Sequence, residues 1–219
     1  MMQLRTYAAP REMHHALRKT LIRTSQFLAD ALTWRKSQRQ YAPAAWCLIG
    51  GAVWLMANPD MASWPFVSIA ALYLLGLLAA VCAIDARYGI IPNSFVVALA
   101  FGGFAETFFI ERAELLQRVI EALLFFIAAY LFRRAYRFVR GHDGLGFGDV
   151  KFATAGVLRV GIEAVPGLLL IAVLSALISL IILRTEGQSL SGKQAISFGP
   201  HLAVALWLAW IAGPLQFAF

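Results

Sequence analysis

Residues 65–84 have the sequence PFVSIAALYLLGLLAAVCAI, which contains no charged side chain. The hydrocarbon core of a bilayer is about 30 Å thick, and an α-helix rises about 1.5 Å per residue, so a run of this length is what one membrane-spanning helix requires. The next residue is Asp85. This stretch therefore predicts a transmembrane helix that carries a carboxyl group at its end.

The composition of the whole chain agrees with a membrane protein. Of its 219 residues, 60% are hydrophobic and only 14% are charged, whereas soluble proteins average about 45–50% apolar and about 25% charged residues. A water-soluble enzyme, a disordered chain and a coiled coil are thereby excluded. The only two cysteines, Cys47 and Cys82, both fall in apolar runs and are too few for a disulfide framework or a zinc site. We expect no metal and no cofactor.

Seven apolar segments are candidate membrane spans. They comprise residues 44–57, 65–84, 90–110, 119–132, 150–165, 166–183 and 195–213. The fourth is short and contains Glu121, and the fifth is interrupted by Arg159 and Glu163. We predict an all-α polytopic transmembrane helix bundle with six or seven spans, in which six spans plus a re-entrant segment is the alternative.

Residues 1–42 differ from the rest of the chain because they are strongly basic. Eight Lys and Arg residues lie within the first 40 positions, and Leu17, Leu21, Leu28 and Leu32 recur near helical spacing. This pattern is typical of a basic amphipathic helix on an anionic membrane surface, with a solvated helical tail as the alternative. We therefore expect a cytoplasmic amphipathic segment, 1–42, and a transmembrane domain, 43–219.

The basic residues also predict the orientation of the chain. Lys and Arg are enriched in short cytoplasmic loops of membrane proteins. With seven spans and a cytoplasmic amino terminus, only Arg112, Arg118 and Arg159 of the 19 basic residues fall on the other side. The net charge of +7 then reflects this orientation, and we expect membrane lipid and no nucleic acid as a partner.

Two aspartates lie at the predicted cytoplasmic boundary. Asp85 ends the first quoted run, and Asp149 lies in the glycine-rich sequence GLGFGDVK, residues 144–151. Two predicted spans separate them, so both return to the same side of the membrane. Because ionisable groups at membrane depth are expensive and usually functional, we expect the two carboxyls to meet there.

A pair of carboxyls can hydrolyse a peptide bond. One ionised carboxylate deprotonates a water molecule, while the other, protonated, hydrogen-bonds the scissile carbonyl and later protonates the leaving nitrogen. The alternative is structural, because an aspartate near Arg87 or Lys151 can serve only as a helix cap or an ion-pair partner.

The flanking residues suit a reactive pair. Gly146 and Gly148 allow the backbone to approach a substrate closely, and Lys151 is placed to hold Asp149 in its ionised form. Pro92 favours a helix start, and Asn93 is a candidate cap for backbone amides beside Asp85.

These motifs resemble those of the type IV prepilin peptidases, membrane aspartic peptidases of the GxGD type. Ile91-Pro92-Asn93 follows Asp85, Gly146-Phe147-Gly148-Asp149-Val150-Lys151 supplies the second motif, and Phe198-Gly199-Pro200 begins the last apolar segment. The resemblance covers roughly residues 70–213.

The resemblance implies an endopeptidase of the bacterial inner membrane. It would remove the short basic leader of prepilins or pseudopilins at the cytoplasmic face, with Asp85 and Asp149 as catalytic residues. Pro92, Asn93, Gly146, Gly148 and Lys151 would be supporting positions. Longer family members carry Cys-x-x-Cys motifs associated with zinc and with methylation of the new amino terminus. This sequence has no such motif, so we expect no N-methyltransferase activity.

Two other functions compete with this one. A presenilin-like intramembrane protease shares the GxGD element, but places its first aspartate in a Tyr-Asp pair, whereas Ile84 precedes Asp85 here. A non-catalytic membrane component, such as a transporter or secretion-channel subunit, would use the aspartates only for ion pairing or proton transfer.

A cluster of four arginines precedes the glycine-rich sequence: Arg133, Arg134, Arg137 and Arg140. Since the leaders of prepilins are themselves basic, we interpret the cluster as a topology anchor near lipid phosphates rather than a substrate contact. His142 and Asp143 follow it, and we expect them to be a solvated loop pair.

Overall fold

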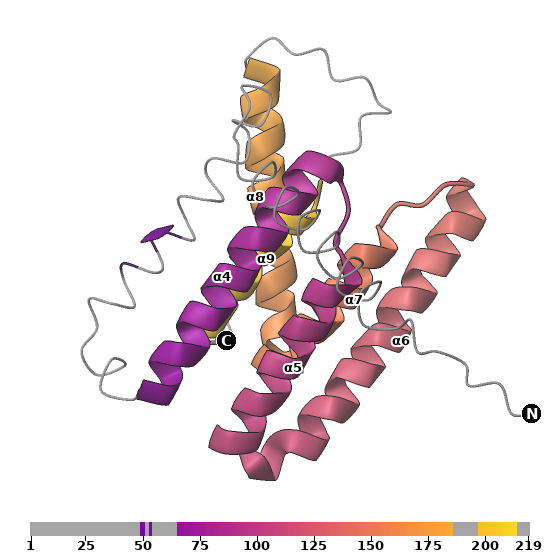
Figure 1. Cartoon of the computed structure of the whole chain (residues 1–219). Helices are drawn as coiled ribbons and strands as arrows, with labels where there is room; N and C mark the ends of the chain where they lie inside the picture. The colour runs from indigo at the N-terminus through magenta and orange to yellow at the C-terminus, as the bar shows by residue number, and fades with distance from the viewer. Residues whose placement is uncertain (1–48, 51–52, 54–64, 186–196, 214–219) are drawn as a thin grey trace, which may run out of the picture.

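The computed structural model describes residues 49–50, 53, 65–185 and 197–213 (Figure 1). Its main helices are α4 (Pro65–Tyr88), α5 (Asn93–Ile110), α6 (Leu115–Arg140), α7 (Phe147–Val160), α8 (Val165–Thr185) and α9 (Gly199–Ala212), with 3₁₀ turns η2 (Arg112–Glu114) and η3 (Ile162–Ala164). The described residues include no β-strand, which confirms the all-α prediction. The amphipathic helix, Cys47 and most of the first predicted span lie outside the described residues.

Four of these helices are long and apolar enough to cross a membrane, namely α4, α5, α6 and α8 together with their flanking turns. The fourth predicted span, which is short and contains Glu121, belongs to the 26-residue helix α6. Helices α7 and α9 have 14 residues each, or about 20 Å at 1.5 Å per residue. The prediction of one span over residues 150–165 is wrong, because α7 stops at Val160 and Gly161, at φ 80°, turns the chain out of the helix.

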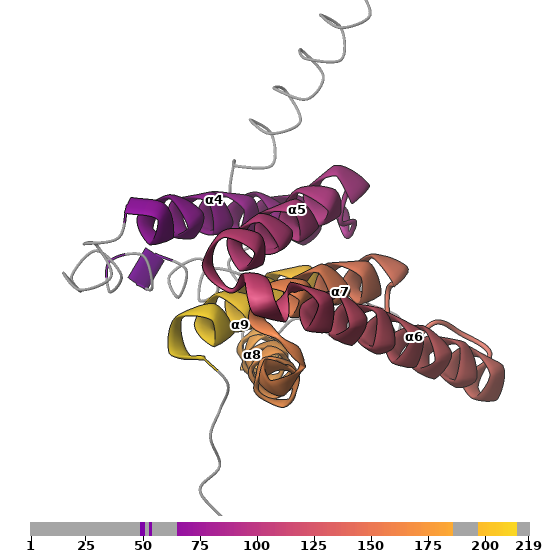
Figure 2. The same cartoon turned by 90° about the horizontal axis from the view of Figure 1, so that it is seen from below.

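Helix α9 is the centre of the bundle. It packs against α4, α7 and α8, and Figure 2 shows it lying between α4 and α8. Its residues from Gly199 to Trp207 are all buried. A helix that is apolar all round is stable only where other helices or lipid surround it.

The outer helices expose large apolar side chains. Examples are Phe101 and Phe109 on α5, Leu116 and Phe132 on α6, and Ile178 on α8. On a soluble protein such surfaces would promote aggregation, but hydrocarbon tails solvate them in a bilayer. Exposed apolar belts on α5, α6 and α8 therefore agree with a polytopic membrane protein.

One end of the bundle gathers the candidate site residues. Successive helices run in alternating directions, so the carboxyl end of α4 lies at the same end of the bundle as the amino ends of α5, α7 and α9 (Figure 1). The chain leaves α4 through Gly89, whose φ of 65° lies in the left-handed region that glycine tolerates best. This brings Asp85 and Asp149 to one end, as the sequence predicts.

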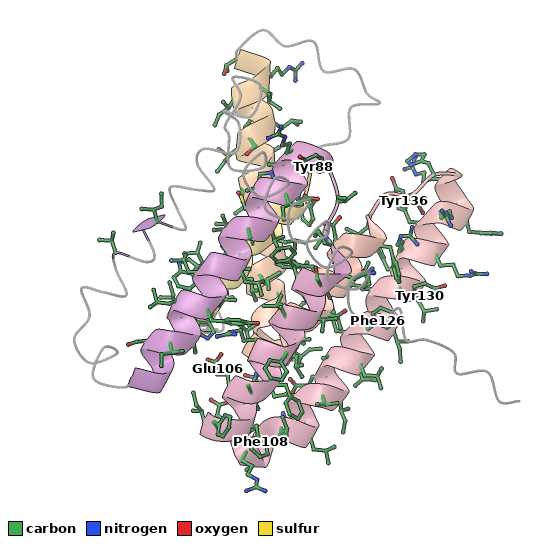
Figure 3. The ribbon with its side chains drawn as sticks, viewed as in Figure 1. Tyr88, Glu106, Phe108, Phe126, Tyr130 and Tyr136 are labelled. Carbon is green, nitrogen blue, oxygen red and sulfur yellow. The ribbon has the colours of Figure 1, made fainter. Side chains whose placement is uncertain are left out.

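The opposite end is held by a buried ion pair between Arg159 of α7 and Glu106 of α5. Arg159 also donates to the carbonyl of Ala70 on α4 at 3.2 Å, and Trp210 of α9 donates to Glu106 Oε1 at 2.8 Å. Figure 3 shows Glu106 near this end and Tyr88 near the other. The charged residues inside the third and fifth predicted spans therefore join four helices.

Candidate active site

Asp85 lies in the last turn of α4, three residues before its last residue, Tyr88. Its carboxyl group is buried, with the residue only 4% exposed. The helix extends through Tyr88, beyond the predicted boundary at Ile84, so the aspartate is part of a rigid element. A side chain on a regular helix is held more accurately than one on a loop.

The start of α9 supplies hydrogen bonds to Asp85. The amide of Gly199 donates to Asp85 Oδ2 at 2.9 Å, and the hydroxyl of Ser197 donates to the Asp85 backbone carbonyl at 2.8 Å. The first amides of a helix have no partner within the helix and carry partial positive charge. The Gly199 amide therefore favours the ionised carboxylate of Asp85 and fixes its direction.

Close packing at this point requires glycine. A Cβ built on Gly199 would lie 2.5 Å from Asp85 Oδ2 and 3.0 Å from Asp85 Cβ. Any larger residue would push α9 away from the end of α4. Gly199 thus determines how closely the two helices approach.

Asp149 occupies the first turn of α7. Burial is the main cause that raises the pKa of Asp149 from 3.8 to about 7, followed by the charge of Asp85, while a hydrogen bond from the Gly146 backbone lowers it. Asp149 precedes the apolar part of α7 and lies outside the four spanning helices. Near neutral pH this carboxyl group is divided between its protonated and ionised forms.

The two carboxyls form an interacting pair, since the charge of Asp85 acts on Asp149. Like charges in a low dielectric oppose each other's ionisation, so the pair favours a state with one proton between them. Each acid also faces a helix amino terminus, α9 for Asp85 and α7 for Asp149. This arrangement can supply a general base and a general acid at the same end of the bundle.

A second contact joins the segments that carry the two acids. Lys151 Nζ donates to Asn93 Oδ1, which connects the second residue after Asp149 to the first residue of α5. Two expectations are therefore wrong. Lys151 is directed to Asn93 instead of Asp149, and Asn93 makes no side-chain cap to the α5 amides. Its carboxamide oxygen is instead occupied by the lysine.

The remaining supporting positions, Pro92, Gly146 and Gly148, lie in the same region, between the start of α5 and the start of α7. Pro92 immediately precedes α5 with φ −63° and ψ 139°, the extended geometry expected before a helix start. A Cβ on Gly148 would lie 3.5 Å from Ile91 Cβ, and one on Gly146 would lie 2.7 Å from Asp149 Oδ2. Gly146 therefore leaves space for the carboxyl group, while Gly148 faces the turn before α5.

The loop between α6 and α7 is not a free solvated loop. Asp143, expected to be solvated, accepts ion pairs from Arg133 at 2.9 Å and Arg137 at 2.7 Å. Two of the four clustered arginines are therefore engaged with the protein itself. The interpretation of the cluster as a topology anchor near lipid phosphates stays a prediction.

Sequence reasoning missed Ser197 and the Gly199 amide as contributors to the site. The sequence Phe198-Gly199-Pro200 did signal a helix start, because proline is favoured at the first helical positions. Nothing in the sequence says which side chain that free amide would meet. In the part of the chain that the structure covers, no three His, Cys, Asp or Glu residues are grouped as a metal site would require.

These features define a polytopic helical membrane protein with two interacting acids at one end. Residues 72–181 match the type IV leader peptidase family. The chain is 31% identical over 179 residues to the prepilin leader peptidase/N-methyltransferase of Dickeya chrysanthemi, covering 80% of this chain and 59% of that protein. It is 32% identical over 149 residues to the protein of the same description in Aeromonas hydrophila, covering 67% of this chain and 50% of the relative.

The chain therefore belongs to the type IV leader peptidase family. It spans between half and three fifths of the length of these curated relatives. No solved structure matches it significantly. The resemblance identified from the motifs around Asp85 and Asp149 is confirmed at the level of the family.

Proposed function

We propose that this protein is an aspartic endopeptidase that removes the leader peptide from prepilins or pilin-like precursors at the cytoplasmic face of the bacterial inner membrane. The observation that carries the proposal is the interaction between the carboxyls of Asp85 and Asp149 in a chain of the type IV leader peptidase family. The curated relatives are described as prepilin leader peptidases, which supports this class of substrate.

The geometry suggests how the two acids divide the reaction. Asp85, which accepts a hydrogen bond from the Gly199 amide, is the ionised base that takes a proton from water as the water oxygen attacks the scissile carbonyl carbon. Asp149, with a pKa of about 7, is the protonated partner that hydrogen-bonds the carbonyl oxygen. When the C–N bond breaks, Asp149 gives its proton to the leaving nitrogen, and the proton that Asp85 took from water then passes to Asp149, so both acids return to their starting state.

The five supporting positions contribute by placing the two acids. Lys151 and Asn93 connect α7 to the start of α5, and Pro92 sets the direction in which α5 begins. Gly146 leaves room for the Asp149 carboxyl group, and Gly148 faces the turn at Ile91. We assign these residues to positioning and keep the catalytic role for the two aspartates.

Coexpression with candidate pilin precursors tests the proposal. Asp85→Asn and Asp149→Asn should each abolish leader removal, because asparagine cannot exchange a proton and still has nearly the same shape. The matched control combines Cys47→Ser with Cys82→Ser and should process precursor normally. Normal processing by either asparagine variant would remove the acid pair from consideration and favour a non-catalytic membrane component.

A further inference from the structure

The loop that leads into Asp149 is attached to α6 by one arginine. Arg133 makes three contacts, to residues 143, 145 and 147 in turn. Its guanidinium group lies 2.9 Å from Asp143 Oδ2, its Nε donates to the Leu145 carbonyl at 2.9 Å, and its Cζ lies 5.5 Å from the Phe147 ring centroid. The last contact is only two residues before Asp149.

Neighbouring side chains of α6 reinforce this attachment. Arg137 donates to the same oxygen of Asp143 at 2.7 Å. The Tyr136 ring closely covers Gly144, where a Cβ would come within 2.4 Å of it, and Tyr130 meets the Phe147 ring edge-on at 6.3 Å. Figure 3 shows Tyr130 and Tyr136 on α6, with Tyr136 nearer the loop end.

The loop needs such an attachment because its sequence is intrinsically flexible. Residues 141–148 include glycines at positions 141, 144, 146 and 148, and each glycine gives the backbone more freedom than any other residue. Fixing the backbone of one residue costs about 1–2 kcal/mol in conformational entropy. Contacts outside the loop are therefore needed to hold it in the conformation that leads into Asp149 at the start of α7.

Arg133 is better suited to this role than the other clustered arginines. Its side chain is only 16% exposed, whereas that of Arg137 is 58% exposed. Its planar guanidinium group can bind a carboxylate and a carbonyl at once and also lie over an aromatic ring. Arg134, the next residue of α6, is exposed and adds the same charge on a different face of the helix.

We propose that Arg133 is a positioning residue for the peptidase reaction, which sets the place of Asp149 by holding Asp143, the Leu145 carbonyl and Phe147 against α6. The inference rests on the proposed function. Positioning has large kinetic effects, since a misplacement of about 1 Å can lower a rate by about 100-fold. The residue is expected to affect turnover while leaving substrate binding nearly unchanged.

The experiment compares Arg133→Gln, Arg133→Lys and Arg134→Gln in the full-length protein purified in detergent, with a pilin precursor as substrate. Arg133→Gln should lower kcat by about 10- to 100-fold with KM changed less than about twofold. Arg133→Lys keeps the charge near Asp143 but cannot also bind the Leu145 carbonyl, so its kcat should be intermediate. Arg134→Gln should keep the wild-type kcat and KM.

The pH profile separates positioning from simple loss of folded protein. A loosened loop admits water to Asp149 and lowers its pKa toward the usual value. The alkaline limb of the kcat profile should therefore move to lower pH in Arg133→Gln. Fewer folded molecules would lower kcat at every pH and leave the limb in place. Asp143→Asn should shift the limb in the same direction, and provides the test if Arg133→Gln fails to fold.

Several outcomes would overturn the inference. A wild-type kcat for Arg133→Gln would do so, as would an equal loss in Arg134→Gln, which would indicate a general charge effect. A raised KM with unchanged kcat would mean that Arg133 contacts substrate instead. Failure of the proposed function is distinguishable, because wild-type protein would then leave the precursor uncut or Asp149→Asn would cut it.

Discussion

The backbone amide of Gly199 donates to Asp85 Oδ2 at 2.9 Å, so the first residue of α9 fixes a carboxyl group on the last turn of α4. Asp149 has a related environment, because it lies in the first turn of α7. Each acid thus meets the amino terminus of a helix, where partial positive charge gathers. Burial opposes ionisation at this site, and the helix termini counter it.

Substituting Gly199 by alanine should strongly reduce the proposed peptidase activity. The new Cβ would lie 2.5 Å from Asp85 Oδ2, so either the carboxyl group or the start of α9 must move. A shift of about 1 Å corresponds to a loss in kcat of about 100-fold. Cleavage of a pilin precursor by the purified variant measures this loss.

Gly76→Ala is the matched control. This glycine lies on α4, the same helix as Asp85, and no atom lies within 4 Å of the Cβ that alanine would add. The variant should retain wild-type kcat and gain up to about 1 kcal/mol in helix stability. Equal activity in the two alanine variants would show that the Gly199 contact is unimportant for catalysis.

Activity should fall as the pH rises above about 7. The pKa of Asp149 is raised from 3.8 to about 7, so above that pH the proposed acid progressively loses its proton. We expect kcat to drop by up to about tenfold for each further pH unit. A kcat that stays constant from pH 6 to pH 9 would contradict the assignment of Asp149 as the acid.

The raised pKa of Asp149 should also make the folded protein less stable as pH rises from about 4 to about 7. In that window the unfolded chain has released the Asp149 proton while the folded chain still holds it, so the folded state binds more protons and loses stability with increasing pH. Asp149→Asn has no titrating carboxyl group at this position and so lacks this pH-dependent loss of stability. The unfolding temperature of the variant relative to wild type should therefore be higher at pH 7.5 than at pH 4.5.

Breaking the ion pair at the far end should destabilise the bundle without altering the chemistry. Arg159→Met leaves Glu106 buried without its ion-pair partner, a change that typically costs about 3–5 kcal/mol. The double variant Arg159→Met with Glu106→Gln should recover much of this loss. Denaturant titration in mixed micelles measures the free energy of unfolding, and kcat of the folded fraction should stay the same.

Arg118→Gln is the comparison for that experiment. Arg118 pairs with Glu111 and Glu114, whose side chains are 49% and 51% exposed, so its loss should cost about 0–1 kcal/mol. If Arg118→Gln destabilises the protein as much as Arg159→Met, then burial of the Arg159–Glu106 pair is not the cause of the destabilisation in Arg159→Met.

The orientation of the bundle is tested with reporter tags. Helix α9 runs from the end that carries Asp85 toward the opposite end of the bundle (Figure 1). If the two acids face the cytoplasm, a tag placed after Phe219 should report the non-cytoplasmic side and one placed before Met1 the cytoplasm. A cytoplasmic signal from the carboxyl-terminal tag would contradict the predicted topology.

Mature pilin processed only by this chain should have an unmethylated amino terminus. The 219 residues contain two cysteines, 35 positions apart, and so no Cys-x-x-Cys motif. Mass spectrometry of pilin from cells without another methyltransferase measures the added mass directly. A methyl group on the new amino terminus would contradict the prediction.

The sequence by itself determined the fold class and singled out the two acids that we propose as catalytic residues. Apolar runs long enough to cross a bilayer allow only helices here, because unpaired backbone groups are too costly in hydrocarbon. Asp85 directly follows such a run, and Asp149 follows a glycine-rich segment. Both acids stand out because an ionisable group at membrane depth is costly. These features can be recognised from short stretches of sequence alone.

Only the tertiary structure decided which groups surround the acids. Lys151 is two residues from Asp149, yet its ammonium group binds Asn93, 58 residues away. The amide that binds Asp85 belongs to Gly199, 114 residues further along the chain. Such partners depend on how rigid helices pack and on the direction each side chain takes from them. That packing is set by contacts among all the helices at once, which no short segment of sequence specifies.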